Sequence, residues 1–245
     1  MENEFQYDVL KRMDKAEANQ CMKTAFSSLL TAQEYFNIGK YDFAKIYYKE
    51  AAILYNKLYF ATLNSDFREE IAETTNKLAE EAGYHLGLCC YDNFEFDDAI
   101  YVLDYKCMDS TRSAALLALC YRKHNNVPIP QRKYSLAYEY IKRVLNDVEY
   151  ATSLKSEYEE KIYVEIIILV SEIYRIGSTF ESHLLGKYDT PYKDIVPDSK
   201  KAADLLNKTL VNVTFESNKT SLLNALNQYK KESKGFLSFI KKLFH

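Results

Sequence analysis

AFSSLLTAQEYFNIGKYDFAKIYYKEAAILY, residues 25–55, predicts two antiparallel helices joined by a tight turn. Gly39 falls in the turn, where the left-handed conformation that ends a helix carries no Cβ penalty. Small residues at Ala32 and Ala44 allow the two helices to approach closely, and Tyr48 continues an apolar stripe at helical spacing. Such a hairpin cannot bury its own apolar face. The rest of the chain is therefore expected to supply helices that stack against it.

The composition favours long helices. The 245 residues include only six glycines and four prolines, too few for sheets with many turns. The first twenty residues contain no apolar run, and the longest strongly apolar segment, residues 166–170, is too short to span a bilayer. These features favour a cytoplasmic protein. The five cysteines follow no disulfide or zinc spacing, so reduced, buried thiols are expected.

The features of residues 25–55 resemble a tetratricopeptide repeat, a helix–turn–helix unit of about 34 residues. A second, weaker copy follows, in which Ala99 and Leu103 take the places of Ala44 and Tyr48. Phe94 stands where the first copy has its turn glycine.

The second half of the chain is similar to the Sel1-like repeat, a relative whose loop between helices is longer and usually contains Val-Pro. Val127-Pro128 precedes Ala137, and Val196-Pro197 precedes Ala202, in the same order. Between residues 178 and 195 lies an insertion that is unusual for this family. It is either a tolerated surface loop or a contact site.

The predicted fold is all-α, a right-handed α-solenoid of antiparallel helix pairs with a capping helix at each end. The expected parts are a capping helix at 1–20, tetratricopeptide-like repeats at 21–63 and 64–110, Sel1-like repeats at 111–150 and 151–212, and a C-terminal helix with a basic tail at 213–245. Within residues 3–20, Phe5, Val9, Leu10 and Met13 recur at helical spacing. Terminal repeats need such a cap.

In the tetratricopeptide family, the first helix of each pair lines the concave groove. This resemblance assigns to the groove Phe26, Leu29, Gln33, Phe36 and Asn37 of the first repeat, and Glu81, Tyr84, Leu88, Tyr91 and Asp92 of the second. These side chains are apolar, aromatic or acidic, which disfavours the carboxylate-clamp mode of the family and suits an amphipathic or basic helix. The alternative is that the long helices fill the groove and these residues are core.

Charge is unevenly distributed. Residues 66–105 contain eleven acids and two bases, whereas residues 219–245 contain six lysines and one glutamate. The end of the chain, residues 235–245, forms a basic amphipathic tail. Its members are Phe236, Phe239, Ile240, Lys241, Lys242, Leu243 and Phe244. The tail either folds back as a cap, docks in a partner's groove or lies on an anionic membrane.

No sequence motif for catalysis, metal binding or phosphate binding is present, and no cofactor is expected. Nucleic acid is disfavoured because the pI is about 5.9 and no basic stripe occurs outside the tail. We therefore expect a non-catalytic adaptor, chaperone-like or regulatory protein that binds a protein or peptide partner. The alternatives are a membrane-associated component recruited through residues 235–245 and a helical enzyme without a recognisable motif.

Overall fold

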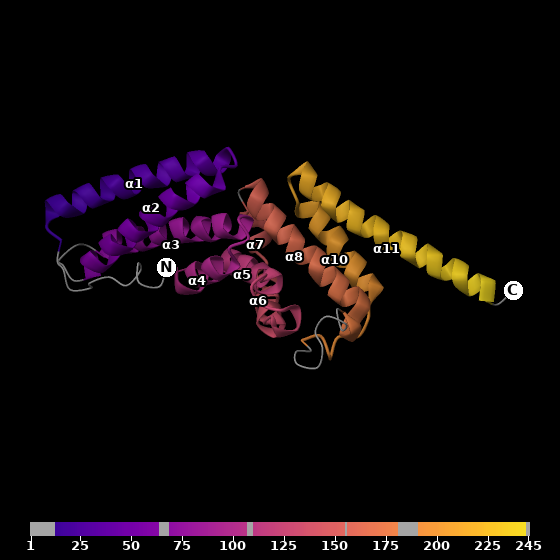
Figure 1. Cartoon of the computed structure of the whole chain (residues 1–245). Helices are drawn as coiled ribbons and strands as arrows, with labels where there is room; N and C mark the ends of the chain where they lie inside the picture. The colour runs from indigo at the N-terminus through magenta and orange to yellow at the C-terminus, as the bar shows by residue number, and fades with distance from the viewer. Residues whose placement is uncertain (1–12, 64–68, 107–109, 155, 181–190, 244–245) are drawn as a thin grey trace. The chain divides into compact units, whose positions relative to one another are not determined.

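The computed structural model describes residues 13–63, 69–106, 110–154, 156–180 and 191–243, and is shown in Figure 1. The chain divides into two compact units, Met1–Asn126 and Val127–His245. Every regular element in the described ranges is a helix, which confirms the all-α class. Within these ranges, no helix is both long enough and apolar enough to cross a membrane.

The helices of the first unit are α1 (Lys15–Asn37), α2 (Tyr41–Leu63), α3 (Glu69–Asp92), α4 (Phe96–Lys106) and α5 (Thr111–Lys123). Those of the second unit are η1 (Ile129–Gln131), α6 (Tyr134–Asn146), α7 (Tyr150–Ser153), α8 (Glu157–Ile176), η2 (Gly177–Thr179), α10 (Ser199–Asn212) and α11 (Glu216–Leu243).

Helix α1 begins earlier than the predicted start of the first repeat. Asp14 caps the helix: its side chain accepts hydrogen bonds from the backbone N–H groups of Ala16 and Glu17, at 2.7 and 2.8 Å, and the Glu17 carboxylate accepts from the Asp14 N–H. From there α1 runs unbroken past Cys21. Residues 15–20 therefore belong to the first hairpin and not to a separate leading helix. Residues 1–12 of the predicted cap lie outside the described residues.

The turn between α1 and α2 is the one that Gly39 predicts. Gly39 has φ of 73°, in the left-handed region. Its N–H donates to the Phe36 carbonyl at 3.0 Å, and the Lys40 N–H donates to the Tyr35 carbonyl at 2.9 Å. This pair of bonds is the Schellman motif, which satisfies carbonyls that the end of a helix leaves free.

The turn between α3 and α4 repeats this geometry without a glycine. Phe94 has φ of 60°, and its N–H donates to the Tyr91 carbonyl at 3.0 Å. The Glu95 N–H donates to the Cys90 carbonyl at 2.8 Å. The two turns are therefore the same motif, placed at corresponding positions of the two hairpins. Phe94 does take the position of Gly39, as the alignment of the two copies predicts.

Packing inside the two hairpins follows the same spacing. Ala44 and Ala99 are fully buried, and so are Tyr48 and Leu103. A Cβ added to Gly87 on α3 would lie 2.8 Å from the Leu103 side chain, so α3 and α4 approach too closely there for a larger residue.

An aromatic contact across each turn also recurs. The edge-to-face pair of Phe36 and Tyr41, with ring centroids 5.2 Å apart, corresponds to the pair of Tyr91 and Phe96 at 5.9 Å. The first hairpin and the second hairpin are thus copies in their turns and cores.

The second unit has a core formed by α8, α10 and α11. Glu160 of α8 is buried, and its carboxylate accepts hydrogen bonds from the Thr214 and Phe215 N–H groups, at 2.7 and 2.9 Å. It also accepts from Asn218 Nδ2 at 3.0 Å. These bonds hold the segment between α10 and α11 against the start of α8.

The predicted insertion at 178–195 is partly described. Gly177 has φ of 70°, and a Cβ there would lie 2.7 Å or less from Ile195 and Pro197, so the chain returns tightly to the end of α8. Tyr192 is buried and packs edge-to-face on Phe180 and Tyr138. Tyr192 is therefore a core residue. The middle of the insertion, residues 181–190, lies outside the described residues.

Candidate interaction surface

A charged cluster ties α3 to α5 around Glu81, one of the predicted groove residues. The half-buried Glu81 carboxylate accepts a hydrogen bond from His85 Nε2 at 3.0 Å, one turn along the same helix. Its other oxygen accepts from Arg112 Nη2 of α5. The hydrogen bond from His85, and after it the hydrogen bond and charge of Arg112, lower the pKa of Glu81 to about 2, against the opposing effect of burial. The carboxylate therefore stays ionised at neutral pH.

Aromatic rings from three helices surround His85. The imidazole stacks on Tyr48 of α2, with centroids 5.1 Å apart and planes at 11°. Phe36 of α1 and Tyr84 of α3 each lie edge-to-face with the imidazole, at 5.5 Å. The buried Nδ1 has no hydrogen-bond partner among the described residues. His85 is thus packed as part of the core that joins α1, α2 and α3.

Helix α5 covers the predicted groove face of α3. The Arg112 guanidinium lies 4.3 Å from the ring centroid of Tyr84. The Lys123 ammonium lies 4.9 Å from that of Tyr91 and donates a hydrogen bond to its hydroxyl. Both tyrosines are buried, as is Leu88 between them. These three residues are core in the first unit, in agreement with the alternative that the helices themselves fill the groove. Asp92, at the end of α3, is half-buried.

The groove positions on α1 are more open. Leu29 is buried, and Gln33 and Phe36 are half-buried, but Asn37 is exposed and 54% of the Phe26 surface is accessible. Leu30 follows Phe26 by one helical turn and is 45% accessible. Phe26 and Leu30 therefore form an exposed apolar pair on one face of α1, which we call the α1 patch. Phe26 is a predicted groove residue, whereas Leu30 is not among the predicted positions.

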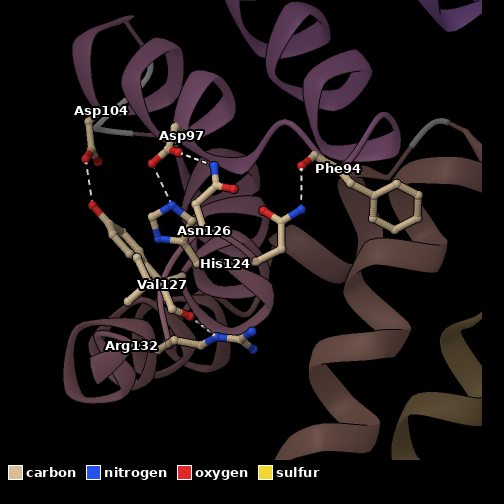
Figure 2. Close-up of polar contacts among 9 residues, drawn as sticks. Phe94, Asp97, Asp104, His124, Asn126, Val127 and Arg132 are labelled. Atoms are coloured by element: carbon tan, nitrogen blue, oxygen red, sulfur yellow. Dashed lines mark hydrogen bonds and ion pairs between the residues drawn. The ribbon is translucent and has the colours of Figure 1, made fainter. Parts of the chain in front are cut away.

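A second group of polar contacts lies at the end of α5 (Figure 2). Asp97, in the first turn of α4, accepts hydrogen bonds from His124 Nε2 and Asn126 Nδ2, both at 2.6 Å. The bond from Asn126, and after it the bond and charge of His124, lower the pKa of Asp97. Asn125 Nδ2 donates to the Phe94 carbonyl at 3.3 Å. These contacts fasten the segment after α5 to α4 and its preceding turn.

The remaining contacts in Figure 2 are also local ties. The Tyr121 hydroxyl of α5 donates to Asp104 of α4 at 2.9 Å. In the second unit, Arg132 Nε donates to the Val127 carbonyl at 3.3 Å and closes the loop that leads to α6. The geometry of these groups thus accounts for local structure.

The contact to Asp97 has an earlier counterpart. Asp42, in the first turn of α2, accepts a hydrogen bond from Asn93 Nδ2 at 2.8 Å. Asp42 precedes Asp97 by the same interval that separates Gly39 from Phe94, and Asn93 and His124 directly follow the ends of α3 and α5. An aspartate in the first turn of α2 and one in the first turn of α4 are thus each bonded to the residue that directly follows the next helix, α3 and α5 respectively. This link was not predicted, because an acid in a first helical turn also has a local explanation.

The described residues contain no group of three or more His, Cys, Asp or Glu side chains that could hold a metal ion. Burial raises the pKa of the Cys90 thiol to about 12, and also raises the pKa values of Cys89 and Cys120. These thiols therefore stay protonated, which makes them poor nucleophiles and poor ligands.

The predicted docking tail lies largely outside the described residues. Helix α11 continues to Leu243, so the backbone of the tail up to that residue is helical. The side chains of Phe236, Phe239, Ile240, Lys241, Lys242 and Leu243, and the whole of Phe244, lie outside the described residues. The role of the tail stays a prediction.

Comparison with known proteins gives no relative: no family model, curated protein or solved structure matches the chain.

Proposed function

We propose that the chain is a helical repeat protein, built as a right-handed solenoid of tetratricopeptide- and Sel1-like hairpins, that binds a segment of a partner protein without catalysis. The observation that carries this proposal is the recurrence of one turn, one core pattern and one link between hairpins at a single constant spacing. Gly39 and Phe94 mark the turns, and Asp42 and Asp97 mark the links. Repetition of the unit together with its link to the next unit is what a solenoid requires.

The interval along the chain from Gly39 to Phe94, which separates the two copies, is longer than a tetratricopeptide repeat of roughly 34 residues. The difference lies in helix length, since α2 has 23 residues and α3 has 24. The turn and the small residues beside it keep the positions of the family, so we interpret the unit as a lengthened version of the same hairpin. Longer helices give each hairpin a wider face for partners.

The α1 patch is the proposed contact surface. Phe26 and Leu30 lie one helical turn apart, a spacing that can receive the apolar face of an amphipathic helix. The half-buried Gln33 and the exposed Asn37 continue the same face with polar groups that suit the rim of an interface. We propose a cytoplasmic adaptor or regulatory protein whose partner offers such a helix.

The test is affinity capture from native cell lysate with wild type, a Phe26→Asp, Leu30→Asp double variant and a Val211→Asp control. Val211 is an exposed apolar residue on α10 and lies outside the proposed surface. Proteins retained by wild type and control but lost from the double variant are candidate partners. Their affinity should fall about tenfold or more for Phe26→Ala alone, equivalent to ~1.4 kcal/mol.

A chain ending at Lys234 separates the α1 patch from the tail. If capture survives this truncation but not the double substitution, recognition lies on α1. If the truncation alone abolishes capture, the tail is the docking element and the proposed surface is wrong. Loss of binding to anionic vesicles on truncation would favour the membrane alternative.

A further inference from the structure

The exposed face of α1 is arranged symmetrically about its centre, which the α1 patch occupies. Lys23 lies one turn before the patch and Glu34 one turn after it, and both side chains are exposed. Asn19 and Asn37, also exposed, lie one turn further out on either side. Neighbours along this series are three or four residues apart, so all of these side chains share one face of the helix.

This face lies on the open side of the first unit. Within that unit α1 packs along α2 (Figure 1), and Phe26 and Leu30 on its other side are 54% and 45% accessible. The corresponding positions of α3 are occupied differently, since Glu81 is tied to α5 and His85 is packed among aromatic rings. The first hairpin therefore ends in an uncovered apolar pair, whereas the end repeat of a solenoid normally presents a polar outer face.

Two charges flank the α1 patch without partners. Neither Lys23 nor Glu34 forms a hydrogen bond or an ion pair with another described residue. The two lie eleven residues apart on one helix, or about 16 Å along its axis, so they cannot pair with each other. A surface that binds this face therefore meets a positive charge at one end of the patch and a negative charge at the other.

A second α1 helix matches this face in one orientation. When two α1 helices cross antiparallel at the level of residue 28, Phe26 of each lies opposite Leu30 of the other, because both are two residues from the crossing point. Lys23 and Glu34, five and six residues from that point, then also meet across the pair. A parallel arrangement would place lysine against lysine and glutamate against glutamate, and such like-charge contacts disfavour an interface. The face is therefore self-complementary, as an isologous two-fold contact requires.

The contact between two such faces is small. The face from Asn19 to Asn37 spans about 27 Å, and each molecule contributes a single helix. Stable interfaces bury more than about 1,200 Å² in total, so we expect weak and reversible association. The ion pairs at the rim of such a contact fix its direction more than they raise its strength.

We propose that two molecules of the chain pair through their α1 helices, antiparallel, with Phe26 of each against Leu30 of the other and Lys23 against Glu34. This inference rests on the proposed function in one respect, that the α1 patch is a contact surface. It adds that the patch is self-complementary, so that a partner helix must displace a second molecule of the chain. Self-association thereby keeps the patch covered until a partner is present.

Sedimentation equilibrium of the purified full chain over a range of concentrations tests the pairing. We expect a monomer–dimer equilibrium in wild type that is unchanged by Val211→Asp, an exposed position on α10. Lys23→Glu or Glu34→Lys alone should raise the dissociation constant about tenfold, because each dimer then contains two like-charge contacts. Both reversals in one chain should return it to within about threefold of wild type, because the ion pairs are restored with opposite polarity.

Three results of this experiment would overturn the proposal. One is a wild type that stays monomeric at its highest soluble concentration. Another is a dimer that neither single reversal weakens, since the contact would then lie elsewhere. The third is a double reversal that associates more weakly than either single one.

Disulfide capture tests the orientation without the charge variants. In the antiparallel pair Asn19 lies opposite Asn37 of the other molecule, whereas the two Asn19 residues are about 27 Å apart. A mixture of Asn19→Cys and Asn37→Cys chains should therefore yield more disulfide-linked dimer than Asn19→Cys alone, with wild type as the control for the native cysteines. Equal yields, or a preference for like pairs, would contradict the proposal. These measurements use the purified chain and no partner, so a monomeric result leaves the capture test of the proposed function unaffected.

Discussion

The first hairpin and the second hairpin turn in the same way with different residues. Gly39 takes the left-handed conformation at no steric cost, whereas Phe94 takes it with a large side chain that is 68% accessible. The intrinsic backbone preference of phenylalanine disfavours this conformation, because bulky residues with positive φ are rare. The Schellman bonds, the core of the hairpin and the hydrogen bond from Asn125 hold Phe94 in place. Tertiary packing, once established, can therefore impose a turn that the residue itself disfavours.

The two hairpins keep their buried positions and change their exposed ones. Ala44 and Ala99 are both fully buried, but the exposed Phe26 has Glu81 as its counterpart in the second copy. Phe26 is open to solvent, whereas Glu81 is tied to Arg112. The same framework thus presents a surface for contact in one copy and a link to the next helix in the other.

The largest expected effect comes from the shared core position. Tyr48→Ala should lower the free energy of unfolding by about 3–5 kcal/mol and Leu103→Ala by about 2–5 kcal/mol, because both side chains are fully buried. Chemical denaturation followed by circular dichroism measures both. Leu30→Ala, on the exposed α1 patch, is the control and should change stability by only about 0.5 kcal/mol. If Leu103→Ala costs no more than this control, the two core positions are not equivalent.

The turn residues can be exchanged to test the strain directly. Gly39→Ala should destabilise by about 1–2 kcal/mol, because its added Cβ meets no other atom within 4 Å and only the backbone conformation is penalised. Phe94→Gly should stabilise by up to ~1 kcal/mol, since relief of the left-handed strain is partly offset by the greater freedom of glycine in the unfolded chain. Thermal melts of the two variants measure these changes in stability, which are expected to have opposite signs. Destabilisation by Phe94→Gly would mean that the ring contact with Phe96 outweighs the strain.

Acid should weaken the second hairpin through Glu81. Its pKa is about 2 in the folded chain and 4.5 without the fold, so its contribution is complete above pH 4.5 and is lost as the pH falls through 2. Allowing for solvent screening of this partly exposed group, we expect wild type to lose about 1–2 kcal/mol more than Glu81→Gln over that range. Denaturation curves at several pH values give the comparison. Parallel pH profiles for the two proteins would show that the carboxylate is not specifically stabilised.

The smallest expected effects concern the links between hairpins. Asp97→Ala should cost about 1 kcal/mol and Asp42→Ala about 0.5 kcal/mol, because Asp97 accepts two side-chain hydrogen bonds from the next segment and Asp42 accepts one. Hydrogen exchange at the ends of α3 and α5 would localise each effect. An effect of Asp42→Ala larger than that of Asp97→Ala would contradict the ranking.

Much of the first hairpin could be predicted from the sequence, because local signals agree there. Gly39, the small residues and the helical stripe all favour one structure. The second turn could also be aligned with the first, because Ala99 and Leu103 are as far along the chain from Phe94 as Ala44 and Tyr48 are from Gly39. Helix α1 begins at Lys15, before the predicted start of the first repeat, and the capping-box pair of Asp14 and Glu17 is a local signal that marks this start.

The interaction surface could be predicted only in part. Helical periodicity identifies which residues share a face, but it does not identify the element that covers that face. Tyr84 and Tyr91 lie two turns apart on one face of α3, yet α5 lies over both through Arg112 and Lys123. That packing depends on residues of a different helix, for which one sequence holds no local signal.

The division of the chain into Met1–Asn126 and Val127–His245 bears on how the protein is made. All elements of the first unit are adjacent in sequence, so they are complete before synthesis of the second unit begins. Translation of residues 127–245 takes on the order of ten seconds, whereas helical domains with local contacts fold within milliseconds. We expect the first unit to fold on the ribosome while the second is still being made.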